Sequence, residues 1–136
     1  INKIDWSRKT RFYDVFRYVQ GLILLRKLHP AFRLRTTEEI RAKLRFLPMP
    51  EGHMVGFTIT DVEGEPWQQI VVIYNANIAP QTVALPGESW VVVVNRERAG
   101  TQPLETIKLP YVTVPALSVS VLADEVSFWR SIDGRG

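Results

Sequence analysis

The sequence predicts a mainly β protein, an antiparallel β-sandwich of about seven to eight strands preceded by one long and one short α-helix. Three observations lead to this prediction. After Arg45, short β-branched and aromatic runs follow one another, each bounded by Gly, Pro or Asn. No helical segment separates these runs, as a parallel βαβ sheet would require. Before Arg45, apolar residues recur every three or four positions, which is the period of an α-helix.

The long helix is predicted over residues 10–28. We expect Thr10 to cap its start by accepting from free backbone amides, and Asp14 to interact favourably with the helix dipole. His29 and Pro30 should end it, because a residue before proline is pushed out of the α region. The apolar residues that share the helical spacing are Phe12, Val15, Phe16, Val19, Leu22, Ile23 and Leu25.

The short helix is predicted to begin at Thr36, where a capping box is present. The Thr36 side chain can accept from the amide of Glu39, and the Glu39 carboxylate can reach back to the first residue of the box. Ile40 and Leu44 follow at helical spacing.

The strands fall into a clear set and a weaker set. Residues 70–73 and 91–94 are unbroken apolar runs, so they are predicted to be central strands covered on both faces. The clear strands are residues 54–60, 69–74, 90–94, 111–114 and 117–122, and the weaker ones are 44–47, 82–85 and 105–109.

Charge is divided unevenly along the chain. Residues 1–45 hold twelve Lys and Arg against four Asp and Glu, a balance of +8, whereas residues 46–136 hold five against ten, a balance of −5. A basic arm for nucleic acid is one interpretation. The alternative, a solvated helix face or one that meets an acidic neighbour, is favoured because the basic residues form no block of five or six. We therefore expect no nucleic-acid partner. The wholly apolar run of residues 22–25 is far too short to span a bilayer, so we expect no membrane partner either.

The residues that could carry chemistry form no complete catalytic constellation. The chain has no cysteine, which excludes disulfides and thiolate sites. His29 and His53 lack metal-ligand spacing and are interpreted as a helix-end residue and a turn residue. A glycosidase needs two facing carboxyl groups, but the candidate aspartates are scattered beside turns and helix starts. No catalytic residue, metal or cofactor is expected here; the aspartates weighed are Asp5, Asp14, Asp61 and Asp124.

The four tryptophans have two interpretations. Core filling is the usual role of tryptophan in a sandwich of this size, but an exposed indole can stack against a sugar ring. Trp67, Trp90 and Trp129 are the candidates for such a platform, while Trp6 lies in the segment before the helix. Trp129 is expected to be the most exposed, since it follows the last predicted strand near a polar terminus.

Particular strings of this sequence closely resemble type I pullulanases, which are glycoside hydrolases of the α-amylase superfamily. Residues 2–6 (Asn-Lys-Ile-Asp-Trp), 18–23 (Tyr-Val-Gln-Gly-Leu-Ile) and 25–33 (Leu-Arg-Lys-Leu-His-Pro-Ala-Phe-Arg) resemble the end of the catalytic barrel in that family. Residues 70–77, 85–87 with Trp90, and 114–118 look like its C-terminal β domain.

The resemblance implies a debranching enzyme that hydrolyses α-1,6 bonds in pullulan, amylopectin and limit dextrins. The family's Asp nucleophile, Glu acid/base and further Asp belong to motifs that precede Ile1, so the chain alone is expected to be inactive. Residues 1–36 would be the last barrel helix region and residues 37–136 the C-terminal β-sandwich domain. Lys3, with Asn2, matches a loop near the family's cleft and is a candidate substrate-binding residue, as is Trp129.

The leading functional hypothesis is therefore a non-catalytic accessory domain that stabilises the barrel of the parent enzyme. The expected partners are that (β/α)8 barrel, α-glucan through the parent, and a second copy of the free chain through the uncovered helix. A carbohydrate-binding module acting through surface Trp residues is the alternative, and a nucleic-acid or protein interaction domain ranks third. The absence of cysteine fits secretion and the cytoplasm equally, so the sequence leaves the location open, with an extracellular or cell-surface one slightly favoured over the cytoplasm.

Overall fold

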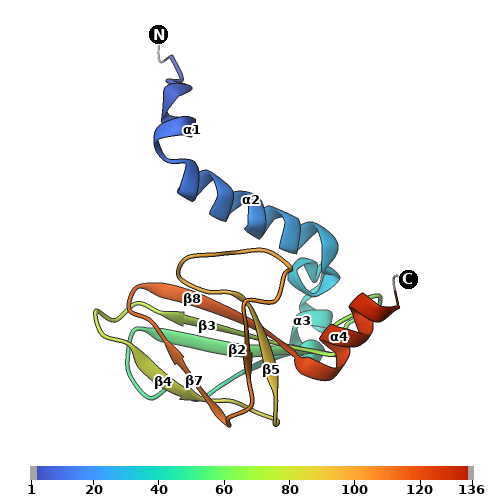
Figure 1. Cartoon of the computed structure of the whole chain (residues 1–136). Coiled ribbons are helices and arrows are strands. Elements are labelled where there is room, and N and C mark those ends of the chain that lie inside the picture. Colours follow the sequence, from blue (N-terminus) through green and yellow to red (C-terminus); the bar gives the residue numbers. More distant parts are fainter. Residues whose placement is uncertain (1–2, 135–136) are drawn as a thin grey trace.

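The computed structural model describes residues 3–134 and contains two antiparallel β-sheets (Figure 1). The larger sheet has six strands in the order β1-β2-β3-β8-β5-β6, and the smaller sheet pairs β4 with β7. The predicted fold class is confirmed. The strands are β1 (Leu44–Phe46), β2 (Met54–Thr60), β3 (Gln69–Asn75), β4 (Gln81–Ala84), β5 (Trp90–Val94), β6 (Glu105–Ile107), β7 (Tyr111–Val114) and β8 (Ser118–Asp124).

The large sheet is the middle layer of the molecule, with helices on one face and the β4–β7 pair on the other (Figure 1). Side chains alternate across it along β3: Ile70 and Val72 belong to the apolar cluster under the helices, while Val71 and Ile73 belong to the cluster under β4 and β7. All four are buried, as is every residue of β5. The prediction that these two runs are central strands covered on both faces is therefore correct.

The helical region before the sheet consists of two pieces rather than one. Helix α1 (Ser7–Arg11) stops at Phe12, whose φ of −117° and ψ of 47° are not helical, and α2 (Tyr13–Leu28) begins after it. The predicted cap at Thr10 is wrong, because Thr10 lies inside α1 and α2 has no side-chain cap. The predicted end is correct: His29 has extended backbone angles and donates to the carbonyl of Leu25.

A 3₁₀ turn, η1 (Pro30–Arg33), and the short helix α3 (Thr37–Lys43) lead into the sheet. The predicted capping box is present. The amide of Glu39 donates to Oγ1 of Thr36 at 3.1 Å, and the amide of Thr36 donates to the Glu39 carboxylate at 3.3 Å.

One helix was not predicted. Helix α4 (Glu125–Asp133) follows β8 directly, and its N-cap is Asp124, which accepts from the amide of Ser127 at 2.9 Å. Asp124 also accepts from the amide of Gln69, so the same carboxylate ties the start of α4 to β3. Among residues 3–134, no helix has the length and apolar content needed to cross a membrane.

Candidate functional site

Helix α2 is fastened to the sandwich by a close backbone contact at Gly21. A Cβ atom at this position would lie 1.8 Å from the carbonyl oxygen of Ala99, in the loop after β5. Only glycine can bring the helix backbone this close to the loop. Three residues away on the helix, the hydroxyl of Tyr18 donates to the carbonyl oxygen of Asn95 at 2.7 Å. Helix α2 thus packs on the loop between β5 and β6, which extends toward the helix in Figure 1.

A buried polar cluster fixes the other end of α2. The Nδ1 atom of His29 lies 2.6 Å from the Glu65 carboxylate, and both side chains are buried. Glu65 also accepts from the backbone amides of Ala31 and Trp67, each at 3.1 Å. The indole of Trp67 stacks on the imidazole with a centroid distance of 3.6 Å. His29 is a helix-end residue as predicted, but its link to the loop between β2 and β3 was not foreseen.

The opposite side of α2 is uncovered. Phe12 and Phe16 are one helical turn apart, and Val19 and Ile23 continue the same row at spacings of three and four. These four side chains, which we call the apolar row, are 37–52% exposed. Burial of such a side chain is worth about 1.5–3 kcal/mol, so a neighbouring domain that covered this row would gain stability from each of its four side chains.

Basic side chains lie directly on the aromatic rings at the start of this helix. The Nζ atom of Lys9 is 4.4 Å from the centre of the Phe16 ring, and the guanidinium of Arg11 is 5.3 Å from that of Phe12. The guanidinium of Arg17 is 5.9 Å from the centre of the Tyr13 ring. We call Lys9, Arg11 and Arg17 the ring cations.

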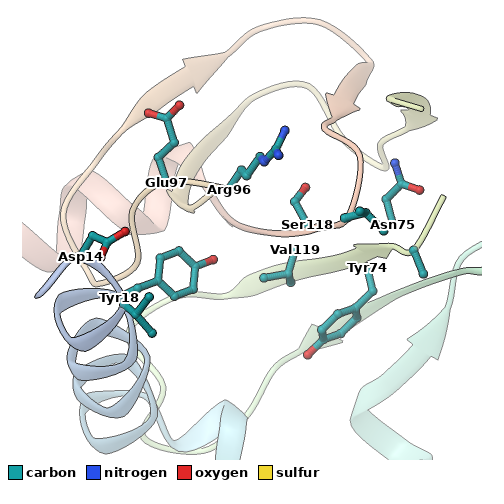
Figure 2. Close-up of a pocket in the computed structure, with 11 residues that line it drawn as sticks. Asp14, Tyr18, Tyr74, Asn75, Arg96, Glu97, Ser118 and Val119 are labelled. Atoms are coloured by element: carbon teal, nitrogen blue, oxygen red, sulfur yellow. The ribbon is translucent and has the colours of Figure 1, made fainter. Parts of the chain in front are cut away.

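A groove of about 900 Å³ separates α2 from the end of β3 and the start of β8. Figure 2 shows Asp14 and Tyr18 on the helix side, Tyr74 and Val119 on the sheet side, and Glu97 with Arg96 on the loop after β5. Burial, followed by the nearby Tyr74, raises the pKa of Tyr18 above its ordinary value, so this hydroxyl keeps its proton for the bond to Asn95. The groove is open, and the two carboxylates among its lining residues, Asp14 and Glu97, come from α2 and from the loop after β5.

The tryptophans divide sharply between core and surface. Trp67 and Trp90 are only 2% and 1% exposed, so the core-filling interpretation is correct for both and neither is an exposed sugar platform. Trp67 is held under His29 and against Phe128, and Trp90 lies between the sheets. Trp129 is 39% exposed on α4 and Trp6 is 74% exposed before α1, so two indoles reach the surface.

The remaining predicted site residues do not converge. Lys3 is exposed at the far end of the α1 segment, and Asn2 lies outside the described residues. Asp5 accepts from the amide and hydroxyl of Ser7, while Asp124 caps α4, so both have local structural roles. Within residues 3–134, no group of three or more His, Asp or Glu side chains could hold a metal ion.

The fold and the uncovered helix define the chain as a β-sandwich module with an attached, partly unpartnered helix. Residues 40–98, from α3 through β5, match the family described as the pullulanase all-beta domain. The curated pullulanase of Bacillus subtilis (strain 168) is 40% identical over 78 residues, which is 57% of this chain and 11% of that protein.

Solved pullulanases match nearly the whole chain. The pullulanase from Bacillus acidopullulyticus has 38% identity and a TM-score of 0.86, over 91% of this chain and 15% of that one. The type I pullulanase of Bacillus subtilis, complexed with maltose, has 30% identity and a TM-score of 0.80, over 90% of this chain and 17% of that one.

These matches confirm the resemblance to pullulanases, which are glycoside hydrolases. The chain spans between about a tenth and a fifth of the length of the relatives it matches, from 11% to 17% in the three above. It therefore corresponds to a small part of much larger enzymes, and its all-beta domain fits an accessory domain of a pullulanase.

Proposed function

We propose that this chain is a non-catalytic accessory domain at the C-terminal end of a pullulanase-type debranching enzyme, and that it stabilises the catalytic barrel. In this proposal residues 1–36 are the last part of the barrel domain and residues 37–136 are the β-sandwich domain. The substrate of the parent enzyme is α-glucan with α-1,6 branch points, and the catalytic carboxylates lie on the barrel.

The observation that carries the proposal is the apolar row of Phe12, Phe16, Val19 and Ile23. Its side chains are open to water on a helix whose other side is fixed by Gly21 and Tyr18 to the sandwich. A helix held in this way presents the row as a fixed surface, and relatives several times longer than this chain have the protein mass to cover it. The barrel is the proposed cover.

The test replaces one residue of the row in a pullulanase that contains this segment. Phe16→Asp should shorten the half-life of the enzyme at an inactivating temperature, because a carboxylate would be buried without a partner at the interface. The KM for pullulan should stay within about twofold, since the row does not touch substrate. Ile78→Asp is the matched control, because Ile78 is an exposed apolar residue on the sandwich, far from α2 in sequence.

Two results would contradict the proposal. One is equal thermal inactivation of the Phe16→Asp and Ile78→Asp enzymes, which would mean that nothing packs on the row. The other is release of reducing sugar from pullulan by the purified 136-residue chain, which would place catalysis in the chain itself.

A second candidate function is carbohydrate binding through α4. Trp129 is partly exposed there, and Val126 and Ile132 flank it at spacings of three on the same side of the helix. Phe128 packs edge-on against the Trp129 indole with a centroid distance of 5.1 Å, which holds the ring in one orientation. A fixed, half-exposed ring of this kind is suited to stack on the apolar face of a glucose unit.

Titration with maltohexaose separates this candidate from the first. If α4 binds sugar, the tryptophan fluorescence of the chain should change at millimolar ligand, and Trp129→Ala should abolish the change. Trp6→Ala is the control, since Trp6 is also exposed but lies away from α4. No response, or a response that survives Trp129→Ala, removes α4 as the binding surface.

Lys3 and Asn2 remain proposed contacts of the parent's substrate. Lys3 is exposed and lies in the segment that precedes α1. This position is compatible with a reach toward a neighbouring domain. In the parent enzyme, Lys3→Ala should raise the KM for pullulan without lowering thermal stability, and an unchanged KM would remove the assignment.

A further inference from the structure

We propose that the surface covering α1 and α2 carries carboxylates that pair with the ring cations Lys9, Arg11 and Arg17, so that this interface is electrostatically complementary as well as apolar. The inference rests on the proposed function, since it names the chemistry of the barrel surface that receives the helices. It begins from the position of the three charges: Lys9 and Arg11 lie over two rings of the apolar row, and Arg17 lies over the neighbouring exposed ring of Tyr13.

Burial of the apolar row also takes the ring cations out of water. Lys9 sits over Phe16, and Arg11 sits over Phe12, both members of the row. A partner that closes on these rings must either push the cations aside or enclose them. Enclosing a charge without a partner costs far more than burying the ring beneath it gains. A covering surface with carboxylates at matching positions removes that cost.

The charge balance of α1 and α2 indicates that the covering surface must supply negative charge. Between Ser7 and Leu28 there are six Lys and Arg residues and a single acid, Asp14. Asp14 lines the groove between α2 and the sandwich, and within residues 3–134 no ion pair joins it to a ring cation. Within residues 3–134, the side-chain ion pairs are His29 with Glu65 and Lys108 with Glu125, and none involves α1 or the ring cations. The neutralising charges must therefore come from the partner.

The same balance argues against a second copy of this chain as the partner. Two copies that met through the apolar row would bring two sets of basic side chains together with only one Asp14 from each. Like charges across an interface disfavour that pairing. DNA would neutralise the cations but would leave Val19 and Ile23 in water. An acidic protein surface with an apolar centre satisfies both the charges and the row.

The experiment uses the intact enzyme that contains this segment. The triple variant Lys9→Glu, Arg11→Glu and Arg17→Glu should shorten its half-life at an inactivating temperature about tenfold at low salt, since three attractive contacts at the interface become repulsive. The difference from the unaltered enzyme should become smaller in 1 M NaCl but should persist, because ion pairs shielded from water are screened less than exposed ones. Arg35→Glu, Arg41→Glu and Arg130→Glu make a control with the same change in net charge on exposed residues outside α1 and α2.

A second measurement locates the carboxylates directly. A carbodiimide joins an amine to a carboxylate in contact with it, so treatment of the intact enzyme should link Lys9 to an Asp or Glu outside this segment. Mass spectrometry of the digested enzyme identifies the linked pair. Because this readout needs no substitution, it is independent of any effect of the triple variant on folding.

The outcomes separate this inference from the proposed function. If Phe16→Asp destabilises the enzyme while the triple variant behaves as its control, the barrel covers the row but carries no carboxylates opposite the ring cations, and the inference fails alone. If neither variant affects stability, both proposals fail. Binding of the 136-residue chain to anionic lipid vesicles through the ring cations, or a dimer of the chain that the triple variant disrupts, would also overturn the assignment of an acidic protein surface.

Discussion

Glu65 is the residue on which the junction between helix and sheet depends. Its carboxylate lies 2.6 Å from the imidazole of His29 and accepts hydrogen bonds from two backbone amides. The side chains of His29 and Glu65 are both buried. The sequence could not reveal this, because Glu65 lies between Gly64 and Pro66 in what reads as an ordinary polar turn. His29 could be placed at the end of the helix from Pro30, but its partner is 36 positions away in the chain.

Glu65→Ala should lower the free energy of unfolding of the chain by about 3–5 kcal/mol, since it removes one partner of a buried pair and leaves two buried amides without an acceptor. Urea denaturation followed by circular dichroism measures the change. Glu63→Ala on the same loop is the control, because Glu63 is exposed. A loss of less than about 1 kcal/mol would mean that water replaces the carboxylate and that the cluster is not a fastening point.

At the scale of single elements, α2 and α3 show two different ways of holding a helix in place. Helix α2 depends on a missing side chain, the Cβ that Gly21 lacks, whereas α3 depends on reciprocal bonds between Thr36 and Glu39. The capping box could be predicted because both partners lie within four residues of each other. The role of Gly21 could not, because its contact with Ala99 is made by a distant loop.

Gly21→Ala should destabilise the chain despite the better helix propensity of alanine. The gain in propensity is about 0.8–1.0 kcal/mol, whereas insertion of a methyl group into a closed contact costs about 1–3 kcal/mol or more. The contact here is with a backbone carbonyl, which cannot turn aside as a flexible side chain can. Hydrogen exchange should show the loop at Ala99 opening more often in the variant, while Gln20→Ala, on an exposed position, should leave it protected. An unchanged or increased stability of Gly21→Ala would show that α2 does not rest on this loop.

The capping box gives α3 a pH-dependent contribution to stability. Hydrogen bonds from the backbone of Arg35 and Thr36 lower the pKa of Glu39. A carboxyl group whose pKa is lower in the folded state stabilises the protein above its ordinary pKa of about 4.3, and this contribution disappears as the pH falls through the lower, folded value. Glu39→Gln should therefore lose less stability than the unaltered chain between pH 7 and pH 3.

Thermal unfolding at a series of pH values measures this difference. Glu38→Gln is the control, since Glu38 shares the first turn of α3 but is not part of the capping box. Parallel loss of stability by Glu39→Gln and the unaltered chain over this range would contradict the assigned role of the carboxylate.

The element boundaries also show where local signals are sufficient. All eight strands lie where β-branched runs and turn residues predicted them, because both signals are local. Helix α4 was not predicted, although its signal is equally local, because the residues after the last strand look like a polar terminus. In the structure Asp124 is an N-cap, and the helix that follows it contains the apolar residues Val126, Phe128 and Trp129. The break at Phe12 has no Gly or Pro to mark it.

At the scale of the whole molecule, the two sheets form most of the apolar core, and helices α1 and α2 are attached to them. Strand β8 pairs with both β3 and β5, so the last strand of the chain completes the centre of the sheet. This order could not be predicted, because pairing between strands far apart in sequence depends on three-dimensional packing rather than on local pattern. Of the residues in the two apolar clusters, only Leu25 among the buried ones belongs to α2.

A shortened chain that begins at His29 should therefore stay folded and remain monomeric. The loss of Leu25 and of the partly buried Tyr18 and Leu22 should lower the free energy of unfolding by a few kcal/mol, at about 1.5–3 kcal/mol for a fully buried side chain. Removal of the apolar row should at the same time increase solubility. Circular dichroism and light scattering check both parts, and a chain that unfolds on shortening would show that the sheet cannot form without α2.

The outermost strands of the large sheet, β1 and β6, are each three residues long. Each of these edges offers only a few unpaired backbone N–H and C=O groups to a strand from another molecule. Extension of the sheet into a fibril from either edge is therefore unfavourable. Any aggregation of the isolated chain should therefore involve the exposed apolar side chains of α2. Such aggregates should dissolve in mild detergent, whereas amyloid fibrils would persist.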